Sequence, residues 1–347
     1  MQLETLSRLR KLAKVDYKEE EADNAEEVLF DVRNLKVYYY TLDGVVKAVD
    51  DVSLKIYRGE TLSLVGESGC GKSTLSLALC RLVQRPGKIV GGQILYKGRE
   101  DILKYDEKQI QRFRGSKVAI VFQDPTSSLN PVFRIGDQIV EAITLHQMLK
   151  GKEAWERSFE ALSLVKIPSP EDMAHSYPHQ YSAGMRQRAM IALALSCNPD
   201  LIIADEPTSN LDVTIQAQIL LLLKELKEKL GTSILLVTHD LGVTAQLADR
   251  VAVMYAGKIV EIALVEEFYR NPLHPYSKAL LGAIPPPHFD VDRLQEIKGD
   301  VPSLVDPPEG CRFHPRCEFA MEICSKKDPK LVKKGNREVA CFLFKKG

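Results

Sequence analysis

Residues 61–73 read TLSLVGESGCGKS, a short apolar segment that runs directly into a glycine-rich loop. The loop fits the pattern G-x-x-x-x-G-K-S/T, and it lies between an expected buried strand at Thr61–Val65 and an expected helix over 74–82. Glycines let successive backbone N–H groups turn toward phosphates, and the N-terminus of the following helix adds its positive end. The stretch therefore predicts a nucleotide-binding fold with a parallel β-sheet.

Three positions of this loop are interpreted individually. Lys72 reaches the β and γ phosphates, Ser73 binds Mg²⁺, and Cys70 occupies a free position of the pattern, where a small residue fills the loop. The predicted nucleotide-binding residues of this segment are Gly66, Ser68, Gly69, Cys70, Gly71, Lys72, Ser73 and Thr74.

A second apolar strand, Leu201–Ala204, ends in two acidic residues. We expect Asp205 to hold Mg²⁺ and Glu206 to polarise the attacking water as general base. A solvated acidic strand end is the alternative, and the phosphate loop in the same chain argues against it.

Composition limits the classes of partner. Lys plus Arg equals Asp plus Glu at 47 each in 347 residues, so no net charge draws the chain to nucleic acid or anionic lipid. No apolar run approaches the ~20 residues of a membrane-spanning helix, and no secretory signal is recognised. We expect a soluble protein that reaches a membrane only by docking onto other proteins.

The pattern along the chain predicts an α/β fold. Antiparallel strands are expected from Val28 to Ile56, and apolar strands at 118–122, 201–204 and 233–237 are separated by helical stretches, as in a doubly wound parallel sheet. The predicted parts are a helical extension and linker (1–28), a nucleotide-binding domain (29–265) with an inserted helical subdomain (about 124–190), and a C-terminal extension (266–347) as a separate small module with four cysteines.

From about Phe30 to Lys258 the chain resembles the ATP-binding cassette (ABC) family. Residues 181–188, YSAGMRQR, are similar to the family signature, in which a serine and a glycine at a helix N-terminus contact the γ phosphate of ATP held by the opposite subunit. The resemblance gives these tasks to Ser182 and Gly184, although Ser182 also fits a plain helix N-cap. It implies a P-loop ATPase fold of ABC type with an N-terminal antiparallel β subdomain.

Further family motifs follow in order. Gln123 matches the Q-loop, which senses Mg²⁺ and leads to the surface that touches membrane subunits; residues 209–212 resemble the D-loop; and His239 matches the switch histidine at the γ phosphate. Tyr39 matches the aromatic residue that stacks on adenine, with Tyr38 and Tyr40 as alternatives in register. The implied catalytic residues are Lys72, Gln123, Glu206 and His239, and the implied Mg²⁺ ligands are Ser73, Gln123 and Asp205.

Two stretches look like the ATPase subunits of dipeptide and oligopeptide importers: residues 271–281, NPLHPYSKALL, and the cysteine tail. The resemblance implies ATP hydrolysis that powers peptide import from the cytoplasmic face of a membrane. The implied partners are a second, different ABC ATPase subunit, two transmembrane permease subunits and, indirectly, an extracytoplasmic substrate-binding protein. Oligosaccharides and nickel are carried by relatives of the same group and stay open as substrates.

One position departs from the family pattern. Ala183 stands where the signature normally has its first glycine. Its methyl group either crowds the approaching phosphate, which makes one of the two composite sites weaker, or is tolerated if φ is negative.

Four of the seven cysteines, Cys311, Cys317, Cys324 and Cys341, follow the spacing C-x5-C-x6-C-x16-C. This lacks the close C-x2-C pairs of common zinc modules, and four thiolates suit a 4Fe–4S cluster. Similar tails in importer ATPases carry such a cluster, so the sequence favours a structural 4Fe–4S cluster over zinc and over free thiols.

Three other functions are weighed. An ABC ATPase of chromosome or repair machinery needs a long heptad insertion between Lys72 and Ser182, which this chain lacks. A translation-associated ABC protein carries two cassettes and basic patches, whereas this chain has one cassette and no net charge. An iron-sulfur redox protein would show spectral changes of its cluster during turnover, and we expect none.

Overall fold

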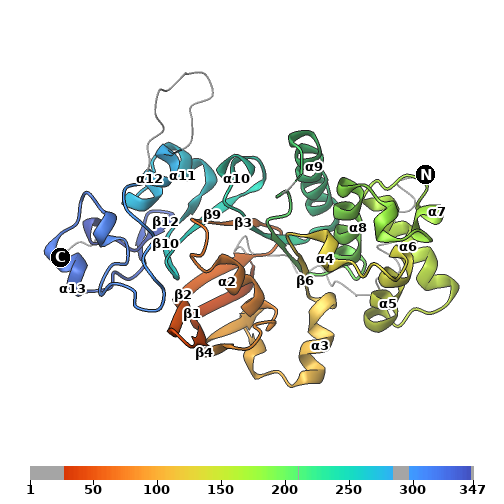
Figure 1. Ribbon diagram of the computed structural model, residues 1–347, viewed down its shortest axis with the longest axis horizontal. Helices are drawn as coiled ribbons and strands as arrows, with labels where there is room; N and C mark the ends of the chain where they lie inside the picture. Colours follow the sequence, from red (N-terminus) through yellow and green to blue (C-terminus); the bar gives the residue numbers. More distant parts are fainter. Residues whose placement is uncertain (1–26, 210, 284–296, 345–347) are drawn as a thin grey trace.

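The computed structural model describes residues 27–209, 211–283 and 297–344, and within them the chain forms two β-sheets flanked by helices (Figure 1). The smaller sheet is antiparallel and has the strand order β2-β1-β4-β5. Its strands are β1 (Val28–Thr41), β2 (Gly44–Tyr57), β4 (Gly87–Tyr96) and β5 (Glu100–Asp101). This is the predicted N-terminal antiparallel β subdomain. The helix predicted within residues 1–28 falls almost wholly outside the described residues.

The larger sheet has the order β11-β12-β10-β9-β3-β8-β7-β6, and β9, β3, β8, β7 and β6 run parallel to one another. Every residue of β3, β7 and β8 is buried, as expected for strands covered on both faces. The strands are β3 (Thr61–Val65), β6 (Val118–Val121), β7 (Leu201–Asp205), β8 (Ser233–Val237), β9 (Arg250–Tyr255), β10 (Lys258–Leu264), β11 (Val332–Lys334) and β12 (Arg337–Val339).

Some helices cover this sheet, and a second group of helices is inserted in the chain between β6 and β7. Because β3, β8, β7 and β6 are parallel neighbours in this sheet, the loops that follow them lie at the same edge of the sheet. The polar motifs are in these loops. The helices near the sheet are α2 (Lys72–Leu79), α3 (Glu107–Ser116), α9 (Val213–Leu230), α10 (Leu241–Leu247) and α11 (Val265–Arg270). Those of the insertion are α4 (Pro125–Ser128), α5 (Ile135–Gln147), α6 (Lys152–Leu164), α7 (Pro170–Ala174) and α8 (Ala183–Leu195), drawn on the right in Figure 1.

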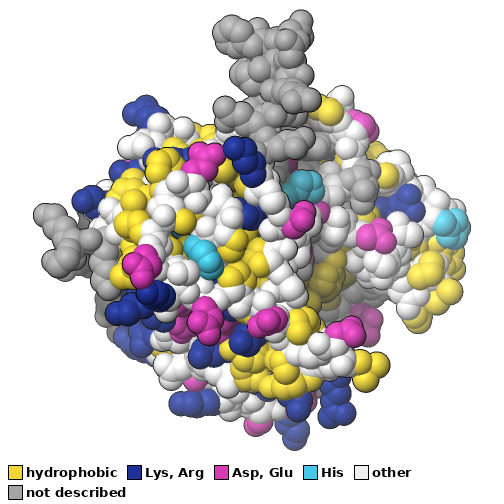
Figure 2. All heavy atoms as spheres, turned by 60° about the vertical axis from the view of Figure 1, so that its left-hand side comes forward, with side chains coloured by type: hydrophobic (Ala, Val, Ile, Leu, Met, Phe, Trp, Pro, Cys, Tyr) yellow, Lys and Arg dark blue, Asp and Glu magenta, His cyan; other side chains and the backbone are white. Residues whose placement is uncertain are grey.

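The C-terminal region differs from the expected separate module, because it extends the larger sheet. Strand β12 pairs antiparallel with β10, so that Val339 lies opposite Glu261. Phe313 and Tyr276 pack in one core with Tyr255 of β9. Its helices are α12 (Pro275–Gly282) and α13 (Glu322–Lys326), with short 3₁₀ turns at His314–Arg316 and Phe342–Phe344. On the face that carries this region, basic, acidic and apolar side chains are intermixed (Figure 2).

Candidate active site

The phosphate loop follows β3 in a backbone conformation that glycine alone accommodates. Gly66 has φ +153°, and a Cβ atom there would lie 2.1 Å from the carbonyl oxygen of Met254. Gly71 has φ +108°, and a Cβ atom there would lie 2.1 Å from the carbonyl oxygen of Ala48. Both positive φ values and the close backbone neighbours exclude a side chain. Helix α2 then starts at Lys72, so its N-terminus points into the loop.

The cation and the hydroxyl of the motif, on Lys72 and Ser73, make hydrogen bonds within the phosphate loop and to the end of β7. The Lys72 side chain is buried, and its Nζ donates to the carbonyl oxygens of Gly66 at 2.7 Å and Glu67 at 3.0 Å. Ser73 Oγ donates to Asp205 Oδ1 at 3.3 Å, which joins the loop to the end of β7. Burial raises the pKa of Asp205, and the hydrogen bond from Ser73 opposes that rise. Hydroxyl and carboxylate oxygens side by side are suitable Mg²⁺ ligands.

Glu206 is the centre of a hydrogen-bonded network just beyond β7. Gln123 Nε2 donates to its Oε2 at 2.8 Å, Ser209 Oγ donates to the same oxygen at 2.9 Å, and His239 Nδ1 lies 2.9 Å from Oε1. Glu206 has φ +49°, unusual for a residue with a side chain, and its N–H donates to the carbonyl of Val237. Segments that follow β6, β7 and β8 thus converge on one carboxylate.

The protonation state of Glu206 suits a base. Partial burial acts to raise its pKa, but the hydrogen bonds from His239 and Ser209 outweigh burial, and the pKa lies below its ordinary value. Glu206 is therefore ionised at neutral pH and able to accept a proton. For His239 to donate to this carboxylate, its proton must be on Nδ1.

The three candidate tyrosines on β1 have different surroundings. The hydroxyl of Tyr39 lies 3.4 Å from Thr74 Oγ1, beside the phosphate loop. Tyr38 donates to Asp50 Oδ1 at 2.7 Å, and Tyr40 is half-exposed with Lys88 above its ring. Tyr39 is thus the tyrosine whose side chain reaches the nucleotide-binding helix.

The signature residues lie at the N-terminus of α8. The Ser182 side chain caps this helix by accepting from the N–H of Met185 at 3.3 Å. Gly184 is buried, and a Cβ atom there would lie 2.9 Å from Ile215 Cγ2. Ala183 is the first residue of α8 and is exposed, and it is not among the described residues with positive φ. In the described part of the chain no hydrogen bond joins these residues to the phosphate loop.

The segment resembling the D-loop also adjoins the network. Besides Ser209, it includes Asp212, whose side chain caps α9 by accepting from the N–H of Ile215 at 2.9 Å. Asn210 lies outside the described residues. The role of Ser209 as a donor to Glu206 was not predicted, although its position three residues after Glu206 in a turn is a usable signal.

The four tail cysteines come together around one cavity of about 10 Å³, which His274 and Phe313 also line. Burial raises the pKa of Cys311 to about 12, and it also raises the pKa values of Cys317 and Cys341. Within the described residues, no group of three or more His, Cys, Asp or Glu side chains is arranged to hold one metal ion. The four cysteines thus have the chemistry of a thiolate site, but their side chains are not arranged around a single metal ion.

Comparison with known proteins identifies relatives across nearly the whole chain. A family model described as ABC transporter matches residues 49–209, and one described as oligopeptide/dipeptide transporter, C-terminal region, matches residues 260–324. The chain is 49% identical to the oligopeptide transport ATP-binding protein AppD of Bacillus subtilis, with 91% of this chain and 97% of AppD covered. It is 45% identical to the oligopeptide transport ATP-binding protein OppD of Salmonella typhimurium, with 93% and 96% covered.

A solved structure shows a similar fold in a post-hydrolysis state. The ATP-binding cassette MJ0796, a dimer bound to ADP and phosphate, superposes with a TM-score of 0.61 at 28% identity, covering 68% of this chain and 99% of that one. None of the described helices is long and apolar enough to span a membrane.

Proposed function

The chain belongs to the ABC transporter family of ATPases, and we propose that within this family it binds and hydrolyses ATP to power the import of peptides. The observation that carries the hydrolysis is the convergence of Gln123, Ser209 and His239 on the carboxylate of Glu206, next to the phosphate loop. The names of its relatives and the match of residues 260–324 support peptides as the substrate class.

Each residue has a proposed part in hydrolysis. Lys72 and the backbone N–H groups of the loop hold the phosphates, while the ring of Tyr39 stacks on adenine. Ser73, Asp205 and Gln123 would hold Mg²⁺, which neutralises phosphate charge when bound. Ionised Glu206 takes a proton from the attacking water.

His239 completes this arrangement by holding the carboxylate of Glu206. Its ring is more than half exposed, which leaves it accessible to the γ phosphate. Donation from Nδ1 to Glu206 fixes the orientation of the ring, as a positioned base and its partner require.

We propose that the site is completed by a second, different ATPase subunit. Ser182 and Gly184 lie at the N-terminus of α8, which can bind an anion through its free N–H groups. Because they make no hydrogen bond with the chain's own phosphate loop among the described residues, they are available to ATP on a partner.

The permease subunits dock, in this proposal, on an apolar groove beside the Gln123 segment. The groove has a volume of about 640 Å³, and Phe133 and Leu145 line it although 53% and 70% of their surfaces are exposed. Exposed apolar side chains of this size indicate a protein contact. Such docking would hold the chain at the cytoplasmic face of the membrane. Replacing Leu145 with Asp should prevent co-purification with the permeases, whereas Leu42→Asp, at the fully exposed tip of the β1–β2 hairpin, should not.

Substrate class is tested through the whole transporter. The chain, its partner ATPase, both permeases and the substrate-binding protein are reconstituted in vesicles, and ATP hydrolysis is measured with peptides, oligosaccharides or nickel. Stimulation by peptides supports the proposal. Stimulation by an oligosaccharide or by nickel alone would replace peptide with that substrate.

We further propose that Cys311, Cys317, Cys324 and Cys341 hold a structural 4Fe–4S cluster. The support is the convergence of four thiols on one cavity and the likeness of the tail to importer ATPases. Because burial raises the pKa values of Cys311, Cys317 and Cys341, binding of the cluster must displace protons from these thiols. Iron, sulfide and zinc are measured in anaerobically purified protein, and zinc without sulfide would refute the cluster. We expect its visible spectrum to stay unchanged during ATP turnover.

A further inference from the structure

Glu67, the second residue of the phosphate loop, is held by an arginine from the far end of the chain. Arg316 Nη1 lies 2.9 Å from Glu67 Oε2, and Arg316 Nη2 lies 3.2 Å from Oε1, which makes a two-pronged ion pair. Only 5% of the Arg316 side chain and 24% of the Glu67 side chain are exposed. Pairs with this geometry combine charge and orientation, and their burial limits screening by salt.

The backbone of Glu67 is held as well. Its N–H donates to the hydroxyl of Tyr276 at 3.0 Å, and Tyr276 is fully buried on α12 against the ring of Tyr255. Both the side chain and the main chain of this loop residue therefore depend on residues that come after β8 in the chain.

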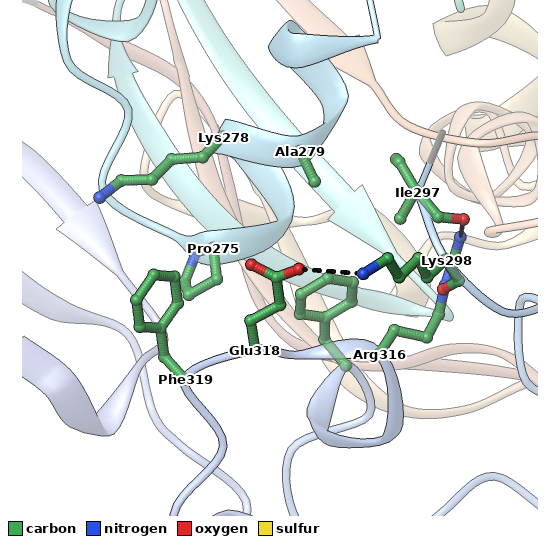
Figure 3. Close-up of a pocket in the computed structure, with 9 residues that line it drawn as sticks. Pro275, Lys278, Ala279, Ile297, Lys298, Arg316, Glu318 and Phe319 are labelled. Carbon is green, nitrogen blue, oxygen red and sulfur yellow. Dashed lines mark hydrogen bonds and ion pairs between the residues drawn. The ribbon is translucent and has the colours of Figure 1, made fainter. Parts of the chain in front are cut away.

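Arg316 is itself fixed in place. Its Nη1 also lies 3.3 Å from the Tyr255 hydroxyl, and its Nε and Nη2 donate to the carbonyl oxygens of Lys298 at 2.9 Å and Ile297 at 3.1 Å. It lines a cavity of about 550 Å³ between α12 and the segment around Glu318, which pairs with Lys298 at 3.7 Å (Figure 3). A guanidinium with this many partners has one orientation, directed at the loop.

The negative charge of the Glu67 carboxylate is unfavourable in a loop that holds phosphates. The loop holds phosphates through backbone N–H groups and Lys72, and a free carboxylate in it would repel a triphosphate. Lys72 also donates to the carbonyl of Glu67, so a displaced Glu67 would change the setting of that lysine.

We propose that Arg316 is a positioning residue for ATP binding: it cancels the charge of Glu67 and fixes the loop, so that the C-terminal region sets the affinity for ATP. This inference rests on the ATP-binding function proposed above and goes beyond it. It makes affinity depend on a residue that lies next to Cys317 and outside the family model matching residues 49–209.

The test uses two substitutions for which the proposal predicts opposite effects. The full chain is titrated with Mg²⁺ and the non-hydrolysable analogue AMP-PNP. Arg316→Gln leaves an unpaired carboxylate and should weaken binding roughly tenfold or more. Glu67→Gln removes the repelling charge and should bind at least as tightly as the parent. The double substitution should recover most of the loss, and Arg316→Lys should be intermediate because it keeps the charge but loses the fork.

Arg312→Gln is the matched control. Arg312 is equally buried and pairs with Asp50 at 2.5 Å, but its bonds do not reach the phosphate loop. Its loss should lower the melting temperature and leave AMP-PNP affinity within about twofold of the parent.

Equal affinities of the parent and Arg316→Gln would overturn the inference, and so would weaker binding by Glu67→Gln, which can be measured even if Arg316→Gln does not fold. A parent chain that fails to bind AMP-PNP would instead refute the ATP-binding function. The two failures are therefore distinguishable.

Discussion

Replacing Glu206 with Gln should separate ATP hydrolysis from ATP binding. Glutamine keeps the shape of the side chain, and its carbonyl can still accept from Ser209 and Gln123, whose donors lie 2.9 Å and 2.8 Å from the same glutamate oxygen. It cannot accept a proton from water. A lost general base slows hydrolysis by about 10²- to 10⁴-fold, which corresponds to a barrier about 3–5 kcal/mol higher.

The assay measures phosphate release by the assembled transporter and nucleotide affinity by titration. We expect release to fall by that factor while affinity stays close to that of the parent, because the phosphate loop and Lys72 are unchanged. Glu228→Gln, at the exposed end of α9, is the matched control and should leave both quantities unchanged. Phosphate release by Glu206→Gln within tenfold of the parent would refute the assignment of Glu206 as the base.

Four other outcomes follow from the same site. Lys72→Ala should weaken ATP binding itself, and unchanged affinity by titration would contradict its role. Ser209→Ala removes a hydrogen bond that lowers the pKa of Glu206, so this pKa should rise. The loss of activity at acidic pH should then begin at a higher pH than in the parent, and an unchanged acidic limb of the pH–rate profile would count against this. The isolated chain should be a poor ATPase, and its specific activity should rise with protein concentration. Strong activity that does not change with concentration would show that the monomer is active and would contradict this prediction. Ala183→Gly should leave turnover of the complex unchanged, because Ala183 is not at a positive φ, and a faster variant would show that its methyl group hinders closure.

Local pattern was enough to predict the parts of the fold that form the site. Strands Thr61–Val65 and Ser233–Val237 were predicted with the observed bounds, because short apolar runs between glycines and helices indicate strands covered on both faces. The phosphate loop was recognised because residues 66–73 fit the pattern G-x-x-x-x-G-K-S/T between an apolar strand and a helix. The structure adds that two of its glycines occupy positions that exclude a Cβ atom. Gln123, Glu206 and His239 were each expected near Mg²⁺ or the γ phosphate, but their contact with one another was not predicted. It arises because parallel strands deliver the residues that follow them to one edge of the sheet.

The C-terminal region was predicted less well. Strands β11 and β12 have three residues each, too few to show the alternation by which a strand is recognised. They form because β10 offers an open edge with which β12 pairs. That pairing depends on the tertiary structure, so the tail was expected to be a separate module.

The pair of Arg316 and Glu67 shows the limit of local pattern most clearly. The two residues are 249 positions apart, and each has a sufficient local explanation: Glu67 fills a free position of the phosphate-loop motif, and Arg316 lies in a cysteine-rich tail. Their ion pair exists only because α12 and the following segment fold back over β9, where Tyr255, Tyr276 and Phe313 pack together. That packing places a cation from the tail against an anion in the loop. A tail that neutralises a charge in the phosphate loop contributes to ATP binding by the ATPase, and this contribution does not depend on what the four cysteines bind.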